Sequence, residues 1–166
     1  MFYEDVRVGQ SLALGEAAFS REAILAFGRR FDPRIVAQAA EGRTPLAASG
    51  LHVAAAGMGQ LVDARSSLRA AMAERGEALP ELGVSPGFKG MRWPYPVHEG
   101  DIVSYSMETV SKRETSKPKW GLVGNSFRGR AAGFGLFERR TRRPTGRRQV
   151  TVAIRPRPDF QMKPAT

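Results

Sequence analysis

The chain has 166 residues, of which 42% are hydrophobic, so it is long enough to form one domain around its own core. It has no cysteine and two histidines, which excludes a disulfide framework, a thiolate nucleophile and a thiolate zinc site, and argues against a histidine-rich metal site. No apolar run reaches the length of a membrane span, and the first residues lack the order of a signal peptide. We therefore expect a cytoplasmic protein without a resident metal.

The net charge of +10 is concentrated at the C-terminal end. Residues 120–166 contain ten Arg and one Lys against two acids, which leaves 15 bases and 14 acids for the rest of the chain. We expect a domain over residues 1–138 and a basic hairpin or strand and tail over residues 139–166 that would complete the same sheet. Such a segment could contact nucleic acid, an anionic membrane or the phosphates of coenzyme A, and the alternative is a solvated face.

The N-terminal part predicts a strand followed by a helix. Residues 8–18 can form the strand, and Ser20 is typical of a helix N-cap. We expect the helix to run from Ser20 to about Phe31. Pro33 disfavours helical geometry at the residue before it, so the chain must turn there and leave the carboxylate of Asp32 at a helix end.

Residues 46–75 are rich in alanine and place apolar side chains at helical spacing. The helical pattern is weakened by residues of lower helix propensity, namely Gly57, Gly59, Ser66 and Ser67. We therefore expect a long central helix followed by a shorter one. The small residues in the first half would let a sheet approach the helix closely.

The remaining sequence is punctuated by prolines and predicts strands. They are expected at residues 88–93, 102–110, 120–127 and 149–154, with a weaker candidate at 133–138. His98 to Asp101 would form the turn between the first two. One helical block followed by antiparallel strands indicates an α+β fold.

The stretch FDPRIVAQAAEGRTPLAASGLH, residues 31–52, contains a recognisable pattern. An Asp-Pro pair begins at Asp32, and the run A-S-G-L-H opens the central helix. In these features the stretch resembles the active-site segment of MaoC-like dehydratases, the hot-dog-fold (R)-specific enoyl-CoA hydratases. That family has a His five residues after the Asp, whereas this chain has Ala37, and its intervening loop is several residues shorter.

Other segments resemble the same family in the same order. The run F-Y-E-D followed by V-G is similar to the family's opening, and residues 93–101, WPYPVHEGD, are similar to its W-x-x-P-V-x-x-G-D element. Residues 111–121 are similar to the segment that follows, and beyond Asn125 the pattern fades. The resemblance implies a hot-dog fold, in which an antiparallel sheet wraps around a long central helix. It also implies a homodimer or a higher homo-oligomer.

The resemblance further implies chemistry on an acyl thioester, with water added or removed across the α,β bond. Family members use the Asp and the His together to activate water and move a proton, which implies Asp32 as the acid/base residue. A backbone N–H near Ser49 and Gly50 would polarise the thioester carbonyl. Without the resemblance, the preferred interpretation of Asp32 is an Asx-type turn around Pro33.

Three more residues are candidate site residues, and each has an alternative explanation without a role in function. His52 lies three residues after Ser49 on one helical face and could replace the missing histidine, or it is a helix residue outside the reaction. Arg113 and Lys117 could bind the phosphates of coenzyme A, and a polar strand edge explains them equally well. The chain has no GxGxxG motif or P-loop, so we expect no cofactor apart from the acyl-CoA or acyl-carrier thioester substrate.

Three functions remain open. The first is an enoyl-CoA hydratase or dehydratase, a hydro-lyase that acts through Asp32. The second is a non-catalytic hot-dog subunit that binds acyl thioesters or supports a catalytic partner, and Ala37 is its main support. The third is a basic nucleic-acid or membrane-surface adaptor that uses residues 139–148, although no specific motif accompanies those arginines.

Overall fold

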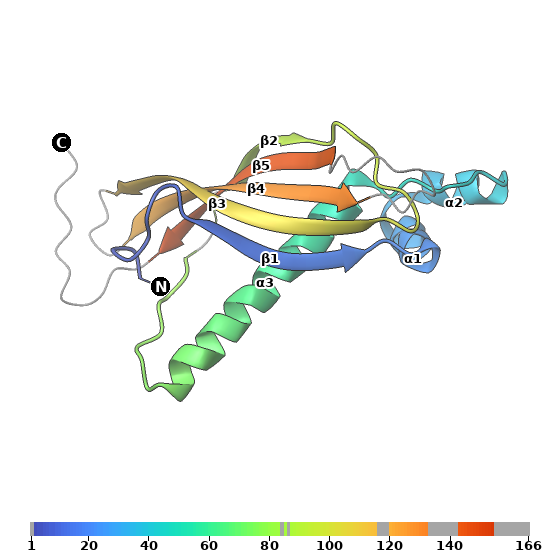
Figure 1. Ribbon diagram of the computed structural model, residues 1–166. Coiled ribbons are helices and arrows are strands. Elements are labelled where there is room, and N and C mark those ends of the chain that lie inside the picture. The colour runs from blue at the N-terminus through green and yellow to red at the C-terminus, as the bar shows by residue number, and fades with distance from the viewer. Residues whose placement is uncertain (1, 84, 86, 116–119, 133–142, 155–166) are drawn as a thin grey trace.

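One antiparallel sheet, two short helices and one long helix make up the fold (Figure 1). The computed structural model describes residues 2–83, 85, 87–115, 120–132 and 143–154, with the backbone alone for 132 and 143–154. In chain order the elements are β1 (Ser11–Ala18), α1 (Arg21–Phe31), α2 (Pro33–Ala40), α3 (Gly50–Glu74), β2 (Gly87–Arg92), β3 (Ile102–Glu114), β4 (Gly121–Ala132) and β5 (Arg143–Ile154).

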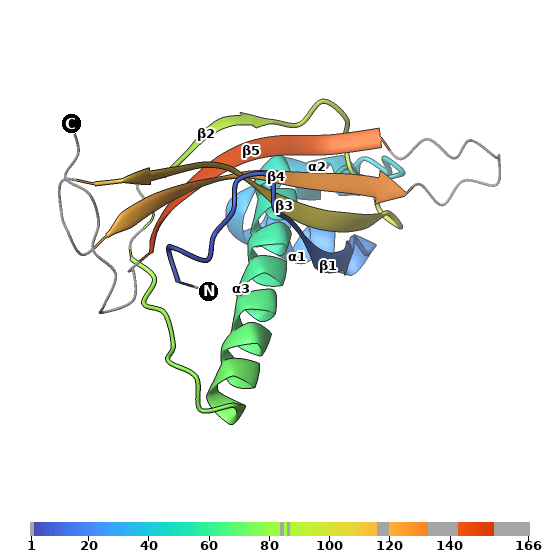
Figure 2. The same ribbon diagram turned by 60° about the vertical axis from the view of Figure 1, so that its left-hand side comes forward.

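The sheet has five strands in the order β1-β3-β4-β5-β2. Every neighbouring pair is antiparallel, and β3 and β4 pair along nearly their whole length. The long helix α3 lies against one face of this sheet, while α1 and α2 lie at the end where β1 finishes (Figures 1 and 2). This is the expected α+β arrangement of a hot-dog fold, with an antiparallel sheet packed around a long central helix.

The first half of α3 makes the closest approach to the sheet. A Cβ atom built on Gly57 would lie 2.7 Å from ring atoms of both Tyr105 and Phe127, so only glycine fits there. The Tyr105 hydroxyl donates a 2.8 Å hydrogen bond to the backbone carbonyl of Val53 one turn earlier. A Cβ on Gly59 would meet nothing within 4 Å, so the expectation that Gly59 serves the same packing is wrong.

The helices differ from the sequence prediction in two places. The expected long helix and shorter helix are one uninterrupted α3 of 25 residues. Ser66 and Ser67 lie on its exposed side, where serine costs a helix only a few tenths of a kcal/mol, about the intrinsic propensity difference from alanine. The segment after Asp32, expected as a loop, is the short helix α2 with Pro33 at its first position, where the missing N–H of proline costs nothing.

The C-terminal strand begins earlier than the predicted 149–154. Residues 143–154 form β5, which pairs with β4 on one side and β2 on the other, so this part of the expected basic hairpin or strand belongs to the same sheet. The weaker strand candidate at 133–138, the rest of the Arg-rich stretch and Lys117 lie outside the described residues. Within the described part of the chain, no helix is both long and apolar enough to cross a membrane.

Candidate functional site

Asp32 lies at the junction of two helices. Its backbone N–H donates to the Gly28 carbonyl and closes α1, and its own carbonyl accepts from Ile35 N–H at the start of α2. Pro33 prevents α1 from continuing, so two helices meet at an angle and the carboxylate projects from the corner. The sequence prediction of a carboxylate at a helix end is therefore confirmed.

Asp32 is paired with Arg34, a residue that the sequence analysis did not single out. Arg34 Nε lies 2.9 Å from one carboxylate oxygen of Asp32, and Nη2 lies 3.1 Å from the other. These hydrogen bonds hold the pKa of Asp32 below its ordinary value, so the carboxylate is ionised. The Arg34 side chain is 85% exposed and that of Asp32 14%, which means that the guanidinium can move into water without a large desolvation cost.

Ser49 is the second predicted site residue near this corner. It precedes α3 as its N-cap, yet its side chain makes no capping hydrogen bond to the helix. Its hydroxyl instead adds a smaller contribution to the lowered pKa of Asp32, after that of Arg34. The fold thus brings Asp32 and Ser49 together, although 17 positions separate them in the sequence.

The start of α3 is held in place by the segment that precedes β3. Ala48 N–H donates to the Val97 carbonyl at 2.7 Å, and Glu99 N–H donates to the Leu46 carbonyl at 2.8 Å. Leu46 and Val97 are both buried, so this short β-bridge is supported by the hydrophobic core. Two segments that resembled one family in sequence are therefore adjacent in space.

Gly50 opens α3 beneath an aromatic ring. A Cβ atom on Gly50 would lie 2.6 Å from two carbons of the Trp93 indole, so the ring packs directly on the first helical turn. The N–H groups of that turn have no acceptor within the helix and can stabilise negative charge. Trp93 is 42% exposed and belongs to the W-x-x-P-V element, which was the available signal for it.

His52 lies among aromatic side chains rather than against Asp32. Its ring stacks on Phe27 with a centroid separation of 4.6 Å and meets the edge of Phe19 at 5.0 Å. Its Nδ1 atom is buried with no hydrogen-bond partner in the described part of the chain. Burial lowers the pKa of the imidazole, so His52 is neutral near pH 7. These surroundings are those of a packed helix residue.

The structure also shows the position where the family has its histidine, which is Ala37 in this chain. Ala37 lies on α2 and is exposed, because the helix turns it away from the core. The only other histidine is His98, whose backbone pairs with Ala47. Neither His52 nor His98 is hydrogen-bonded to Asp32, so no imidazole completes an Asp-His pair within one chain.

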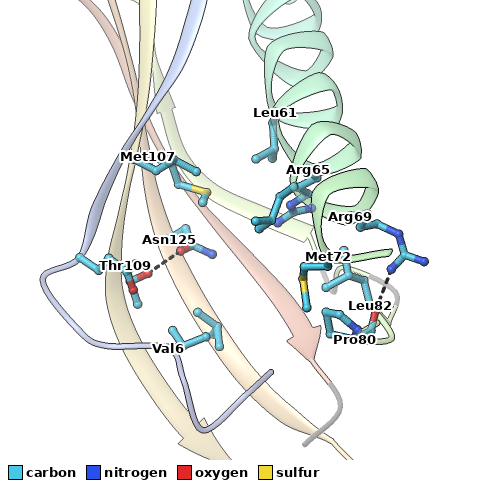
Figure 3. Close-up of a pocket in the computed structure, with 14 residues that line it drawn as sticks. Val6, Leu61, Arg65, Arg69, Met72, Pro80, Leu82, Met107, Thr109 and Asn125 are labelled. Atoms are coloured by element: carbon cyan, nitrogen blue, oxygen red, sulfur yellow. Dashed lines mark hydrogen bonds between the residues drawn. The ribbon is translucent and has the colours of Figure 1, made fainter. Parts of the chain in front are cut away.

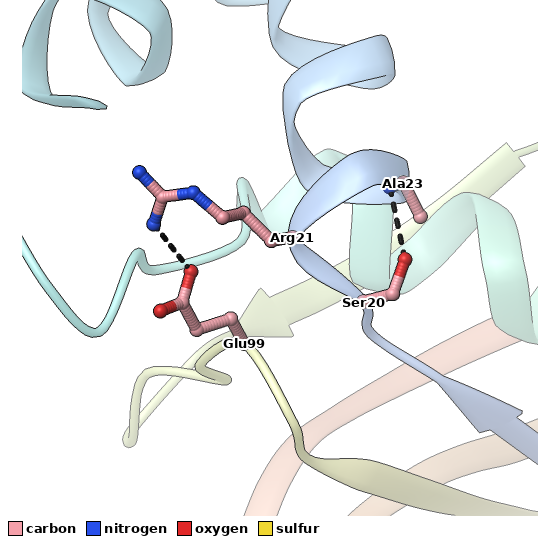
Figure 4. Close-up of polar contacts among 4 residues, drawn as sticks. All are labelled: Ser20, Arg21, Ala23 and Glu99. Atoms are coloured by element: carbon pink, nitrogen blue, oxygen red, sulfur yellow. Dashed lines mark hydrogen bonds and ion pairs between the residues drawn. The ribbon is translucent and has the colours of Figure 1, made fainter. Parts of the chain in front are cut away.

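The turn before β3 fixes α1. Phe19 N–H donates to the Asp101 carbonyl at 2.8 Å, and Gly100 N–H returns a bond to the Phe19 carbonyl at 2.9 Å. Arg21 adds an ion pair to Glu99 at 2.8 Å across the same junction (Figure 4). Beside it, the Ser20 hydroxyl accepts from Ala23 N–H, as expected for the N-cap (Figure 4). These contacts position the helix that carries Asp32.

Arg113 lies far from Asp32. It is exposed near the end of β3, whereas Asp32 lies beyond the end where β3 begins. At about 3.3 Å per residue, the eleven steps from Ile102 to Arg113 amount to about 36 Å. Its neighbour Lys112 binds the carbonyls of Glu4 and Val6, so that lysine secures the N-terminal segment. Within one chain, the structure does not bring Arg113 to the Asp32 corner.

The described residues contain no cluster of three or more His, Cys, Asp or Glu side chains that could hold a metal ion. The groups that the fold does bring together are one carboxylate, one hydroxyl and the free N–H groups of a helix start. That set can accept a proton and stabilise an oxyanion.

No protein-family model and no curated protein matches this chain. Several solved structures do. A MaoC-like dehydratase from Rhodospirillum rubrum is 24% identical, with a TM-score of 0.67 over 95% of this chain and 99% of that one. A Mycobacterium tuberculosis protein with a double hotdog fold is 18% identical, with a TM-score of 0.68 over 98% of this chain and 46% of that one.

An R-hydratase from Pseudomonas aeruginosa is 15% identical, with a TM-score of 0.58 over 99% of this chain and 92% of that one. The structural neighbours are thus MaoC-like dehydratases, (R)-hydratases and hot-dog proteins. At these identities the likeness establishes the hot-dog fold, which confirms the fold expected from the sequence.

Proposed function

We propose that the protein acts on an α,β-unsaturated acyl thioester or its 3-hydroxy counterpart as a hydratase or dehydratase. The observation that carries the proposal is the meeting of the Asp32 carboxylate and the Ser49 hydroxyl at the start of α3. A base next to free helix N–H groups is the arrangement that hydration of a conjugated thioester needs.

In the hydration direction, water would add its oxygen to the β carbon while Asp32 accepts a proton from it. The negative charge that develops on the thioester oxygen would be stabilised by the N–H of Gly50 and by the helix dipole. Asp32 would then return a proton to the α carbon on the same face. Atoms balance with a single carboxylate, since one proton leaves water and one reaches the substrate.

Arg34 would restrain this chemistry. While it is paired, the Asp32 carboxylate is a weaker base, because the pKa is held below its ordinary value. The exposed guanidinium would have to leave as the substrate enters. A carboxylate without the family histidine should also be slow, since the loss of one acid/base group costs about 10²-fold to 10⁴-fold.

A second function is favoured by that same loss. The family histidine position holds Ala37, and neither histidine of the chain is hydrogen-bonded to Asp32. A subunit that binds acyl thioesters without turning them over, or that supports a catalytic partner, would have this site. The two functions share the binding step and differ in the chemical step.

We also propose that a second copy completes the site. Phe31, which precedes Asp32, is 65% exposed, and Leu51, which follows Gly50, is 59% exposed. Two large apolar side chains beside the candidate site fit a covered surface better than a solvated one. Sedimentation of the wild type and of Leu51→Glu tests this: a dimer that the variant weakens is expected, and a monomeric wild type would rule it out.

The chemical step is tested by following the absorbance of enoyl thioesters of several chain lengths. Asp32→Asn should abolish turnover, His52→Ala should leave it nearly unchanged, and Ala37→His should raise it if α2 lets the new ring reach the substrate. A misplacement of about 1 Å costs roughly 10²-fold, so the last variant is the most demanding.

Binding is measured in parallel by thermal stabilisation with a non-reactive acyl thioester. Stabilisation of the wild type without turnover at any chain length would favour the subunit over the enzyme. Turnover that survives Asp32→Asn but not His52→Ala would move the chemistry to His52 and contradict the proposed mechanism.

A further inference from the structure

A cavity lies between the second half of α3 and the sheet, apart from the candidate site. Its volume is about 310 Å³, and none of its lining residues belongs to the Asp32 corner. Nine of its fourteen lining residues are apolar: Val6, Leu12, Leu61, Leu68, Met72, Pro80, Leu82, Met107 and Val123. Figure 3 shows side chains from α3, the sheet and the segment after α3 converging on this space.

A positive charge occupies a core-facing position of α3 there. Leu61, Arg65, Leu68 and Met72 line the cavity at intervals of four, three and four residues, which is one face of a helix. Leu61 and Met72 are buried and Leu68 is 45% exposed, so this face of α3 meets the sheet at both ends of the stripe and is partly open to solvent between them. In Figure 3 the Arg65 side chain lies on that sheet-facing side. An apolar residue is the ordinary choice at such a position.

Arg65 has no partner for this charge among the described residues. Its guanidinium takes part in no hydrogen bond or ion pair there, and it is half-buried. Burial lowers the pKa of the group, because the cavity walls replace water without supplying an acid. Its neighbour Arg69 differs, since it donates a 2.9 Å hydrogen bond to the Pro80 carbonyl.

Two polar side chains lie on the opposite wall. The Thr109 hydroxyl donates a 3.1 Å hydrogen bond to the amide oxygen of Asn125, and both residues are buried. Asn125 retains two amide protons that could donate to an anion. The cavity thus has the cation Arg65 on its helix wall and a neutral donor on the opposite wall, with Gln10 and Arg69 as its other polar lining residues.

We infer that this cavity binds a medium-chain monocarboxylate, with the carboxylate on Arg65 and the hydrocarbon chain among the apolar side chains. Charge complementarity selects the anion, because an Arg fork matches a carboxylate with two parallel hydrogen bonds. The volume of the cavity sets the length of the hydrocarbon chain. A cavity of about 150 Å³ holds benzene, so a space twice as large suits about a dozen heavy atoms, as in decanoate.

This site does not depend on the proposed function. Arg65 is fifteen residues after Gly50, about 22 Å along α3 at about 1.5 Å per residue. A ligand of this length in the cavity would not reach the start of the helix. The binding of a free carboxylate can therefore hold or fail whether or not the protein hydrates thioesters.

The test is calorimetric titration of the wild-type protein with decanoate, methyl decanoate and decyltrimethylammonium. Decanoate should bind at least about tenfold tighter than the uncharged ester, the effect of one charged hydrogen-bonded contact, and the cation should not bind. Equal affinity for acid and ester, or no binding of decanoate, would overturn the inference. These comparisons need no variant.

Variants then place the carboxylate. Arg65→Met keeps an unbranched side chain about as long as the aliphatic part of arginine and removes the guanidinium, so it should weaken decanoate at least about tenfold while leaving the ester unchanged. Arg29→Met removes an exposed arginine of α1 and is the matched control, which should bind as the wild type does. If both variants bind decanoate equally well, the anion does not lie on Arg65.

Two acidic residues of the chain, Glu138 and Asp159, lie beyond the described residues. If either carboxylate is the natural partner of Arg65, its removal should raise decanoate affinity. Glu138→Gln and Asp159→Asn should therefore each leave decanoate affinity unchanged. If decanoate binds only to one of these variants, the natural occupant is the chain itself and the inference fails.

Discussion

The two halves of α3 pack against the same sheet in opposite ways. In the first half, Gly57 lets the rings of Tyr105 and Phe127 touch the helix backbone, and no space remains. In the second half, from Leu61 to Met72, longer side chains face the sheet and a cavity of about 310 Å³ lies between. The same helix therefore contacts the sheet directly at a glycine in its first half and, where it runs away from the sheet in its second half, leaves a cavity (Figure 1).

The polar groups near the two halves of α3 also differ, because one is paired and the other is not. At the start of α3, Asp32 belongs to a recognisable motif and is satisfied by Arg34. In the second half, Arg65 belongs to no motif and has no partner in the described part of the chain. A sequence motif indicates a site that a family shares. A half-buried charge without a partner indicates a candidate binding site that no motif predicts.

The largest effect is expected for Gly57→Leu. The new side chain would collide with two buried rings that cannot move aside, which should lower the free energy of unfolding by about 3 kcal/mol, the upper end of the usual range for overpacking. Gly59→Leu is the control two residues away. It should stabilise slightly, because leucine is a better helix former by up to about 0.8 kcal/mol and space is open. Equal urea midpoints for the two variants would contradict the close packing of the sheet on Gly57.

Gly50→Ala should have a smaller effect. The added methyl would meet Trp93, but that ring is partly exposed and can swing outward, so a cost of about 1 kcal/mol is expected. Trp93→Ala in the same chain should remove the cost. A double-mutant cycle measures it, and purely additive effects would show that the two residues do not touch.

A weaker effect is expected for His52→Phe, which keeps an aromatic ring between Phe19 and Phe27. Burial lowers the pKa of His52 in the folded state, so the unfolded chain binds more protons as the pH falls. The stability from the neutral ring is therefore complete above the unfolded pKa of about 6.5 and is lost as the pH falls from there through the lower folded pKa. Melting temperatures from pH 8 to 5 should decline less in the variant, and parallel curves would contradict the buried neutral imidazole.

The smallest effect on stability is expected for Arg34→Gln, because the pair is at the surface. The variant should raise the pKa of Asp32 toward its ordinary value. In the wild type the lowered pKa contributes stability above the unfolded pKa of about 3.9, and this contribution is lost as the pH falls through the folded value. An NMR titration of the Asp32 carboxyl measures the shift, and an unchanged pKa would mean that Arg34 does not hold the carboxylate in solution.

Local sequence predicted the elements because their causes are local. Ser20 caps a helix with its own hydroxyl, Pro33 ends one helix and begins another, and alternating residues gave the strands. The loop expected between Asp32 and Ser49 was wrong because an eight-residue helix with Pro33 at its first position is equally compatible with the sequence. The break expected at Ser66 and Ser67 was wrong because exposed serines end a helix only where nothing else supports it.

The order of residues is enough to predict the α+β class and the corner at Asp32, since caps and proline geometry act through neighbours in the chain. It indicates close packing on the small residues of α3, but the folded chain was needed to show that Gly57 and not Gly59 makes the contact. What each side chain faces follows from the folded chain. Trp93 lies on Gly50, His52 lies between two phenylalanines and Arg65 lies in a cavity. These contacts join residues far apart in the chain, whereas helical spacing specifies a face without specifying its neighbour.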